Sequence, residues 1–512
     1  MPPLHIAIVA HTAWGHVRPL CVLAARLVAL RDVDITFLTS SYQHGQVSAE
    51  ILHALGYSDA ELAGRIRVVG LAYNERNPLD AATIHTSFEA AFAALAKAAP
   101  VPCAATQQSL PALAPPAALI VDIHGHKHME SARRLAPATP IWASGPASLA
   151  ASYTLFGPFG ADSRGALRRR VDEYVAEHGR EHMRDALEAI AHPTDEVLYP
   201  PGLPPMYKYE LFPQEPIWKL HVIGLLHLAA SAVTHDCDAF LSASTSLYEP
   251  PEAVRAFEAF FALTGRKMYM LGPLVPDTAT LHDAKSQQDE TMSEIETFMD
   301  DVLQRHGPQS LVYISFGTLV WPSEPDRLWT VLDVLLARHI PFILAHPAPS
   351  AHIPSTISDK LSATGLALLT PWAPQRAILA HPATGWFLTH AGFNSVSEAL
   401  CAGVPLICWP FGADAPLNAR HLAQLGVAYE LAEVRAGAQA TRPAYRDGGG
   451  AVPGCTLQGV RAEVRGVFGR ACGEDGAYMR VRAGELRGAM RGLWVEGGAA
   501  RDAAGELLDS LL

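Results

Sequence analysis

The feature that most constrains the fold is an alternation of short apolar runs with segments of helical periodicity. Residues 4–10 (LHIAIVA) and 33–38 (VDITFL) have the pattern of buried strands. Between them Leu20, Leu23, Leu27 and Leu30 recur at helical spacing. Residues 117–122 (AALIVD) and 140–144 (PIWAS) continue the strand series. Strands that alternate with helices favour a parallel sheet covered by helices on both faces.

A second series of the same kind follows later in the chain. Its apolar runs are residues 311–317, 341–346, 366–372, 384–390 and 404–410. Two series in 512 residues predict an α/β protein of two doubly wound domains. We place an N-terminal domain at 1–264 and a C-terminal domain at 265–492, and expect a last helix at about 493–512 to pack back on the first domain. Ligands of such sheets bind beyond the carboxyl ends of the strands, so a cleft between facing domains is the expected site.

Charge and composition exclude several classes of partner. The formal net charge of −12 disfavours binding to the phosphates of a nucleic acid duplex. Seven scattered cysteines without CxxC spacing are typical of reduced thiols in a cytoplasmic protein. The longest uncharged stretch, 135–161, contains several prolines and glycines, which disfavours a membrane span. We therefore expect a soluble, cytoplasmic, monomeric protein.

The most informative segment spans residues 372–419. Within it GWFLTH (385–390) ends as a strand, HAGF (390–393) forms a tight turn, and NSVSEALCAG (394–403) is helical. The N-terminus of a helix after such a turn binds anions through its backbone N–H groups and its dipole. An ordinary helix cap formed by an asparagine or serine explains this short stretch equally well.

The whole segment resembles the signature of the family 1 UDP-dependent glycosyltransferases, the plant secondary-product type with its fungal and animal relatives. The matching pattern is W-A-P-Q, I-L-x-H, G-x-F-x-T-H-x-G-x-N-S-x-x-E, G-V-P, W-P, and then an aspartate and an asparagine. Weaker matches are SFGT (315–318), GH (15–16) and YMLGPL (269–274). The resemblance implies a GT-B fold of two Rossmann-like domains and an inverting hexosyltransferase that uses a UDP-sugar.

The resemblance also implies roles for individual residues of the C-terminal domain. Trp372 would stack on uracil, a role that suits the large flat face of an indole, while the backbone of Ala373 would meet the uracil edge. Gln375 and Glu398 would bond to the ribose hydroxyls. The diphosphate would be held by residues near the strand ends and the helix start: Thr318, His390, Gly392, Asn394 and Ser395.

The sugar pocket carries two departures from the family pattern. Asp414 would accept hydrogen bonds from sugar hydroxyls. Most relatives follow this aspartate with glutamine, whereas this chain has Ala415, and Phe393 stands where the plant pattern has tryptophan. Since alanine cannot bond to a hydroxyl, we expect a relaxed or shifted choice of UDP-sugar, with glucose the expected donor.

The N-terminal domain is expected to supply the acceptor chemistry. Transfer to a hydroxyl needs a general base, and a histidine is suited to this at neutral pH. His16 matches the base of the family and Asp122 its orienting acid, although by sequence position alone His11 competes with His16. Candidate acceptor-lining residues are Trp14, Phe88, His124, Tyr153 and Phe156, which suggest a small apolar acceptor that is phenolic, terpenoid or lipid-like.

Other functions remain open from the sequence. One is a GT-B isomerase or hydrolase that acts on the nucleotide sugar alone, and another is a non-catalytic UDP-sugar binder. A third is a metal-dependent hydrolase that uses His124, His126 and His128, whose HxH spacing at a strand end suits zinc. A nicotinamide dehydrogenase is disfavoured because HTAWGHV lacks the closely spaced glycines of a dinucleotide site. For the transferase we expect no cofactor and no metal beyond the UDP-sugar.

Overall fold

The computed structural model describes residues 3–56, 60–74, 81–157, 165–276, 288–445 and 452–512. The chain divides into two compact units, neither of which is continuous in sequence. Unit 1 comprises Met1–Ala191, His221–Thr278 and Gly492–Leu512; unit 2 comprises His192–Leu220 and Ala279–Arg491. The sequence-based division at 264/265 places His192–Leu220 in the N-terminal domain, whereas in the structure this segment belongs to unit 2.

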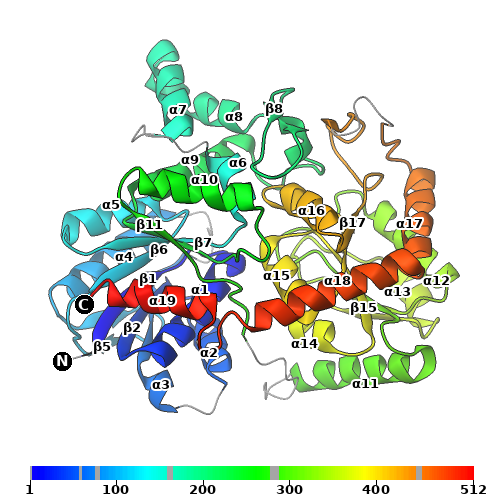
Figure 1. Cartoon of the computed structure of the whole chain (residues 1–512), viewed down its shortest axis with the longest axis horizontal. Coiled ribbons are helices and arrows are strands. Elements are labelled where there is room, and N and C mark those ends of the chain that lie inside the picture. Colours follow the sequence, from blue (N-terminus) through cyan, green and yellow to red (C-terminus); the bar gives the residue numbers. More distant parts are fainter. Residues whose placement is uncertain (1–2, 57–59, 75–80, 158–164, 277–287, 446–451) are drawn as a thin grey trace. The chain divides into compact units, whose positions relative to one another are not determined.

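Unit 1 is built on a seven-stranded parallel sheet with the order β11-β10-β7-β6-β1-β2-β3 (Figure 1). Its strands are β1 (Leu4–Val9), β2 (Val33–Ser40), β3 (Ile66–Leu71), β6 (Ala118–Asp122), β7 (Ile141–Gly145), β10 (Ala239–Ser242) and β11 (Lys267–Met270). A small antiparallel pair, β4 (Val101–Cys103) and β5 (Gln108–Leu110), forms a separate sheet that contacts β3. The strand order reverses between β1 and β6, and such a switch point is where doubly wound sheets bind their ligands.

The helices of unit 1 connect these strands. They are α1 (Trp14–Leu30), α2 (His44–Ala54), α3 (Ala60–Gly64), α4 (Ala81–Ala96), α5 (His126–Leu135), α6 (Leu149–Phe156), α7 (Gly165–His178), α8 (Met183–Ala191), α9 (Leu220–Asp236) and α10 (Pro251–Ala262), together with α19 (Ala499–Asp509) from the C-terminal end. A 3-10 turn, η1 (Arg180–His182), lies between α7 and α8. α19 packs against β11 and α1 (Figure 1).

Unit 2 repeats the design with a six-stranded parallel sheet of order β14-β13-β12-β15-β16-β17. The strands are β12 (Leu311–Ser315), β13 (Phe342–Ala345), β14 (Ala367–Thr370), β15 (Thr384–Thr389), β16 (Leu406–Cys408) and β17 (Ala428–Glu430). Here the order reverses between β12 and β15. A short hairpin of β8 (Val197–Leu198) and β9 (Met206–Tyr207), with the 3-10 turn η2 (Lys208–Leu211), also belongs to this unit.

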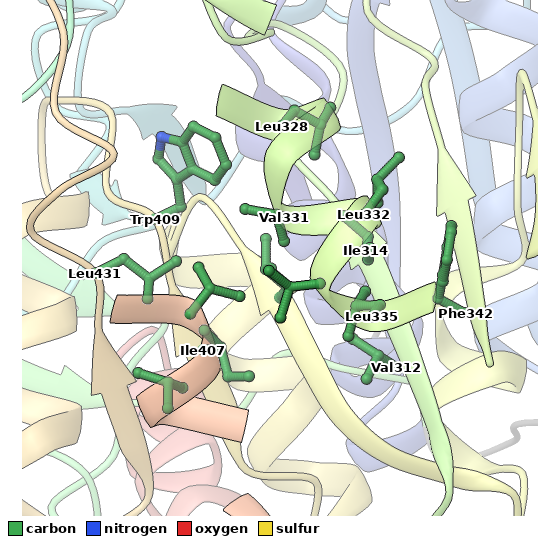
Figure 2. Close-up of a cluster of buried hydrophobic side chains, with 14 of the residues drawn as sticks. Val312, Ile314, Leu328, Val331, Leu332, Leu335, Phe342, Ile407, Trp409 and Leu431 are labelled. Atoms are coloured by element: carbon green, nitrogen blue, oxygen red, sulfur yellow. The ribbon is translucent and has the colours of Figure 1, made fainter. Parts of the chain in front are cut away.

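Helices of unit 2 cover both faces of its sheet. They are α11 (Gln288–His306), α12 (Pro325–Ala337), α13 (Ser355–Ser362), α14 (Gln375–Ala380), α15 (Phe393–Ala402), α16 (Ala415–Gln424), α17 (Leu457–Ala471) and α18 (Glu474–Arg491). Figure 2 shows how the apolar stripe of α12 meets the sheet: Leu328, Val331, Leu332 and Leu335 face Val312, Ile314 and Phe342. Each such side chain removed from water stabilises the fold by about 1.5–3 kcal/mol.

The sequence-based expectations of an α/β fold and of two strand–helix series are confirmed. All nine apolar runs contain strands of the two sheets. Four strands of the two large sheets were not predicted, β3, β10, β11 and β17, nor were the strands of the two small antiparallel pairs. The helical pattern at 168–190 is two helices, α7 and α8, rather than one. Among the described residues, no helix combines the length and the apolar character needed to cross a membrane.

Candidate active site

In unit 1 a histidine and an aspartate meet at the sheet's switch point. β1 and β6 are parallel neighbours, so their carboxyl ends lie side by side. The chain leaves β1 through a short loop and enters α1, whose first turn carries His16. β6 ends at Asp122. The topology therefore brings together two residues that are 106 positions apart in the sequence.

The imidazole and the carboxylate are hydrogen-bonded. His16 Nδ1 lies 2.8 Å from Asp122 Oδ2, and the other carboxylate oxygen, Oδ1, accepts the backbone N–H of His124 at 2.9 Å. Because an ionised carboxylate only accepts hydrogen bonds, Nδ1 of a neutral His16 carries the ring proton and Nε2 carries the lone pair. The side chain of His16 is 23% exposed, whereas that of Asp122 is 2% exposed. Asp122 is thus a buried support, and His16 is the group that solvent or a ligand reaches.

Asp122 is held in its ionised form. Burial by itself raises the pKa of this carboxyl, but the charge and hydrogen bond of His16, together with the charges of His124 and His11, lower its pKa well below the ordinary range. An anion behind the ring fixes the tautomer of a histidine and stabilises the imidazolium that forms when the ring accepts a proton. The pair has the geometry of a general base with its orienting acid.

Two further histidines flank His16. The ring centroids of His11 and His124 lie 5.4 Å and 4.9 Å from that of His16. Burial, the largest effect, and the neighbouring charge of His16 lower the pKa of His11 to about 4. Burial and His16 likewise hold the pKa of His124 well below its usual range. The His11 ring also accepts the backbone N–H of Ala13 through Nδ1 at 3.2 Å, so of the two candidate bases only His16 has a carboxylate partner in these contacts.

The metal cluster considered for His124, His126 and His128 does not form. His126 and His128 lie in the first turn of helix α5, two positions apart and therefore on different sides of the helix, whereas His124 precedes the N-cap Gly125. His126 Nε2 lies 3.6 Å from Glu130, and the ring of His128 packs 4.5 Å from that of Phe88. Within the described residues, the one group with ligand spacing is His16, Asp122 and His124.

The candidate acceptor-lining residues differ in burial and in their neighbours. Phe156, on α6, lies 6.3 Å from the ring of His124, and half-buried Trp14 begins α1. Tyr153 packs against Phe257 at 6.3 Å. Phe88 is fully buried and offers no surface to a ligand.

Sequence reasoning missed one neighbour of this group. His227, on α9, lies 5.7 Å from the ring of Phe156. His227 stands in an apolar helix without a motif around it, so the sequence offered no signal for it.

In unit 2 the loops after β12 and β15 form the corresponding switch point. β12 leads into Gly317 and Thr318, and β15 leads into His390, which directly precedes the start of α15. The His390 ring is packed between two glycines: a Cβ at Gly392 would lie 2.4 Å from Nε2, and one at Gly317 would lie 2.9 Å from Cε1. Burial lowers the pKa of His390 to about 4, so the ring is neutral near pH 7.

Several side chains near α15 form a hydrogen-bonded group. Gln375 Nε2 donates to Glu398 Oε2 at 2.7 Å and lies 3.4 Å from Ser395 Oγ. Gln375 Oε1 in turn accepts the hydroxyl of Tyr313 at 3.4 Å. Tyr313, buried in β12, supports Gln375 through this bond. It was not predicted, because the pattern of its strand identifies it only as a core residue.

Trp372 is more exposed than Trp14, the other tryptophan among the candidate site residues: 42% of the surface of Trp372 is exposed, whereas Trp14 is half-buried. Its carbonyl accepts the Thr370 hydroxyl at 2.5 Å, which anchors the backbone beside the last residue of β14. The following Ala373 is half-buried, and its carbonyl accepts the N–H of Gln375 at 2.9 Å. An exposed indole on a fixed backbone offers a flat surface for stacking.

Asp414 holds two helix starts together. Its Oδ2 accepts the backbone N–H of Phe393 at 3.1 Å and the side-chain amide of Asn418 at 2.7 Å. Asn418 also donates to the carbonyl of Ala391 at 3.0 Å. Phe393 and Ala415 are buried, with 6% and 2% of their surface exposed. The carboxylate therefore has a structural task in addition to the sugar contact expected of it.

Comparisons with known proteins identify the family of the chain. A family model described as UDP-glucoronosyl and UDP-glucosyl transferase matches residues 259–441. The UDP-glycosyltransferase eriJ of Hericium erinaceus is 31% identical over 521 residues, which cover 99% of this chain and 98% of that protein. An anthocyanidin 3-O-glucosyltransferase of Zea mays is 36% identical over 203 residues, 39% of this chain and 38% of that protein.

A solved structure shows the same fold. The Phytolacca americana UGT2 complexed with UDP-2-fluoro-glucose and pterostilbene matches 100% of this chain and 99% of its own, with a TM-score of 0.67 and 21% sequence identity. The two parallel-sheet units are thus the two Rossmann-like domains of a GT-B fold. Because the similarity to eriJ extends over nearly the whole of both chains, the resemblance carried by residues 372–419 is confirmed. This chain belongs to the family of UDP-dependent glycosyltransferases.

Proposed function

We propose that the protein is an inverting UDP-glucosyltransferase that moves glucose to a hydroxyl of a small apolar acceptor, with His16 as general base and Asp122 as its orienting partner. The observation that carries the proposal is the 2.8 Å contact between His16 Nδ1 and the buried carboxylate of Asp122. Glucose as the sugar is supported by the matching glucosyltransferase of Zea mays. Aromatic side chains near His16 support an apolar acceptor.

The proposed reaction is a single displacement. His16 Nε2 takes the proton of the acceptor hydroxyl while that oxygen forms a bond to C1 of glucose. The bond between C1 and the diphosphate oxygen breaks, and UDP leaves with its electron pair. Attack occurs opposite the leaving group, so the configuration at C1 inverts. Asp122 stabilises the imidazolium that results.

Nucleotide binding is assigned to unit 2. Trp372 would stack on uracil beside the backbone of Ala373, and the bonded pair Gln375–Glu398 would hold the ribose. The diphosphate would lie at the N-terminus of α15, with Thr318, His390, Gly392, Asn394 and Ser395 around it. Helix amides and the dipole stabilise a developing diphosphate charge, and we propose that transfer needs no divalent metal. Asp414, next to Phe393 and Ala415, would contact the sugar.

The experiment is an assay of UDP release across a panel of UDP-sugars and phenolic or terpenoid alcohols. We expect release that depends on an added acceptor, with UDP-glucose preferred, and activity that persists in EDTA. Release without any acceptor would instead support the alternative of a nucleotide-sugar hydrolase. No release with any pair of substrates would overturn the proposal.

A matched pair of variants tests the base. His16→Ala is expected to lower turnover by roughly 10²–10⁴-fold while UDP affinity, measured by calorimetry, stays unchanged. His11→Ala removes the neighbouring imidazole, which makes none of the hydrogen bonds to Asp122 described above. Its effect on turnover should be much smaller. The reverse order of the two effects would identify His11 as the base.

A further inference from the structure

Three potential metal ligands converge in unit 1. His16, Asp122 and His124 each offer one ligand atom, and these atoms all lie within 4.8 Å of one another. His16 Nδ1 is 2.8 Å from Asp122 Oδ2, and His124 Nδ1 is 3.6 Å from Asp122 Oδ1. In a tetrahedral zinc site with bonds of about 2.0–2.1 Å, ligand atoms are about 3.4 Å apart. Small side-chain rotations are therefore enough to close this arrangement around an ion.

The chemistry of the three groups suits a transition metal. Two imidazoles and one carboxylate form a common three-ligand set for zinc that leaves the fourth position open to water. A neutral imidazole presents a lone pair to a metal ion without first losing a proton. Side-chain exposures of 23% for His16 and 14% for His124 give an ion a path to the site, while Asp122 is 2% exposed.

We propose that His16, Asp122 and His124 form an inhibitory binding site for Zn²⁺ or a similar borderline transition-metal ion. The inhibition, though not the binding, rests on the role of His16 in the proposed function. The zinc hydrolase considered from the sequence used His124, His126 and His128, whereas this site shares only His124 with it and performs no metal chemistry. Binding of the ion at this site blocks the general base.

Either ring nitrogen of His16 can bind the ion with the same consequence. If Zn²⁺ binds Nε2, the lone pair that accepts the acceptor's proton is occupied. If Zn²⁺ binds Nδ1, the ring proton moves from Nδ1 to Nε2, and Nε2 again has no lone pair. The ion also takes up the charge of Asp122, which otherwise stabilises the imidazolium. Metal and proton thus compete for one imidazole.

The ligand set predicts selectivity among ions. Mg²⁺ and Ca²⁺ prefer six or more oxygen ligands, which a site with two nitrogens and one carboxylate does not provide. Co²⁺ accepts the tetrahedral nitrogen–oxygen geometry and gives it a visible absorption spectrum. Zn²⁺ and Co²⁺ should therefore bind, and Mg²⁺ at the same concentration should not.

The test separates binding from inhibition. Full-length protein is stripped with EDTA, desalted, and titrated with Zn²⁺ against a chromophoric chelator without nucleotide or acceptor, so that metal bound to a diphosphate does not contribute. His124→Asn is compared with His126→Asn, a change in the same segment outside the cluster. His16→Ala enters the binding assay only. Exposed Cys472 is common to all variants, so its binding cancels in the comparison.

We expect His124→Asn and His16→Ala to weaken Zn²⁺ binding at least about tenfold, the smallest effect typical of losing a group that supports a metal site. His126→Asn should bind as the parent does. In the transferase assay, with each rate normalised to its own value without metal, His124→Asn should need at least about tenfold more Zn²⁺ for half-inhibition. Equal Zn²⁺ affinity in the parent and His124→Asn would overturn the proposal, as would equal inhibition of the two. A protein that binds Zn²⁺ through these residues but has no transferase activity would refute the proposed function and leave the site standing.

Discussion

At the scale of single residues, environment gives three histidines of the same chain different capacities. His390 is packed between two glycines and kept neutral by burial, which leaves it suited to donating a hydrogen bond. His11 is kept neutral by burial and by His16. His16 has a buried carboxylate behind its ring and a side chain that is partly exposed. Only this last combination both orients an imidazole and stabilises its protonated form.

Asp122→Asn tests that orientation without removing the base. The amide oxygen of asparagine can still accept the N–H of His124, so the strand end should keep its shape. Its NH₂ group can donate to Nδ1 of His16, which would place the ring proton on Nε2 and block the lone pair. We expect turnover to fall by roughly 10²–10⁴-fold in steady-state kinetics. An unchanged thermal unfolding midpoint serves as the control, and full activity in the variant would refute the role of Asp122.

The site residues were unequally accessible to sequence reasoning. A motif at fixed spacing predicted Trp372, Gln375 and Glu398, because a loop and a helix hold their relative positions locally. The contact between Tyr313 and Gln375 spans 62 positions, and the sequence pattern of a core strand gives no indication of it. Similarly, the predicted sugar ligand Asp414 also binds the backbone of Phe393, which only the packing of two loops reveals. Predictions of ligand roles by motif therefore left out the supporting contacts.

At the scale of elements, the turn between β15 and α15 depends on close approach. Gly392→Ala places a Cβ 2.4 Å from His390 Nε2, although the backbone φ of −63° suits any residue. The ring must therefore move, and we expect UDP affinity, measured by calorimetry, to fall about tenfold or more, the equivalent of a lost hydrogen bond to a charged group.

Gly484→Ala is the matched control. Gly484 lies inside α18, and nothing lies within 4 Å of the Cβ that alanine would add. This substitution should raise helix stability by roughly 0.5–1 kcal/mol and leave UDP affinity unchanged. A Gly392→Ala protein that binds UDP as tightly as the control would show that the ring position of His390 is unimportant.

The start of α6 depends on a buried carboxyl. Glu249 accepts the backbone N–H of Leu149 at 2.8 Å and that of Ala150 at 3.3 Å. Burial raises its pKa from 4.5 to about 7, against the smaller lowering effect of these bonds and of Ser244. Between pH 4.5 and 7 the folded protein therefore binds more protons than the unfolded chain, so this group's contribution to stability falls as the pH rises.

Glu249→Gln tests this linkage, since glutamine does not titrate and its carbonyl oxygen can still accept the α6 amides. The shift from 4.5 to about 7 is equivalent to roughly 3 kcal/mol. The free energy of unfolding of the parent, relative to that of the variant, should decline by up to this amount between pH 4.5 and 7. Urea denaturation at several pH values measures the difference. Parallel pH profiles would show that Glu249 does not titrate in this window.

Three of the four strands missed from the two large sheets lie at sheet edges. β3, β11 and β17 are edge strands, whose burial is incomplete and whose patterns contain Arg67, Lys267 and Glu430. The fourth missed strand, β10, lies inside its sheet and is as short as the predicted strands β13 and β14, so its length does not explain the miss. The central strands are buried on both faces and read as continuous apolar runs. The sequence therefore predicted the sheet centres, where the sites lie, better than the sheet edges.

At the scale of the whole molecule, segments from both ends of the chain belong to unit 1. Unit 1 contains Gly492–Leu512 as well as the N-terminal strands, so this segment is part of its fold. Trp494 Nε1 donates to the carbonyl of Leu271 at 3.0 Å, and the guanidinium of Arg26 lies 4.4 Å above the same indole ring. On α19, Leu507 and Leu508 are almost fully buried.

Leu507→Ala tests whether this segment stabilises unit 1. Deleting a fully buried leucine side chain costs about 2–5 kcal/mol, so urea denaturation should show a transition of unit 1 at lower denaturant concentration. Because the nucleotide-binding residues are assigned to unit 2, UDP affinity in the absence of denaturant should stay at the parental value. Leu512→Ala, at a position that is 81% exposed, is the control and should change neither quantity. If Leu507→Ala unfolds at the same urea concentration as this control, helix α19 does not stabilise unit 1. If Leu507→Ala abolishes UDP binding in native buffer, the folding of unit 2 depends on unit 1, and UDP binding cannot be assigned to unit 2 alone.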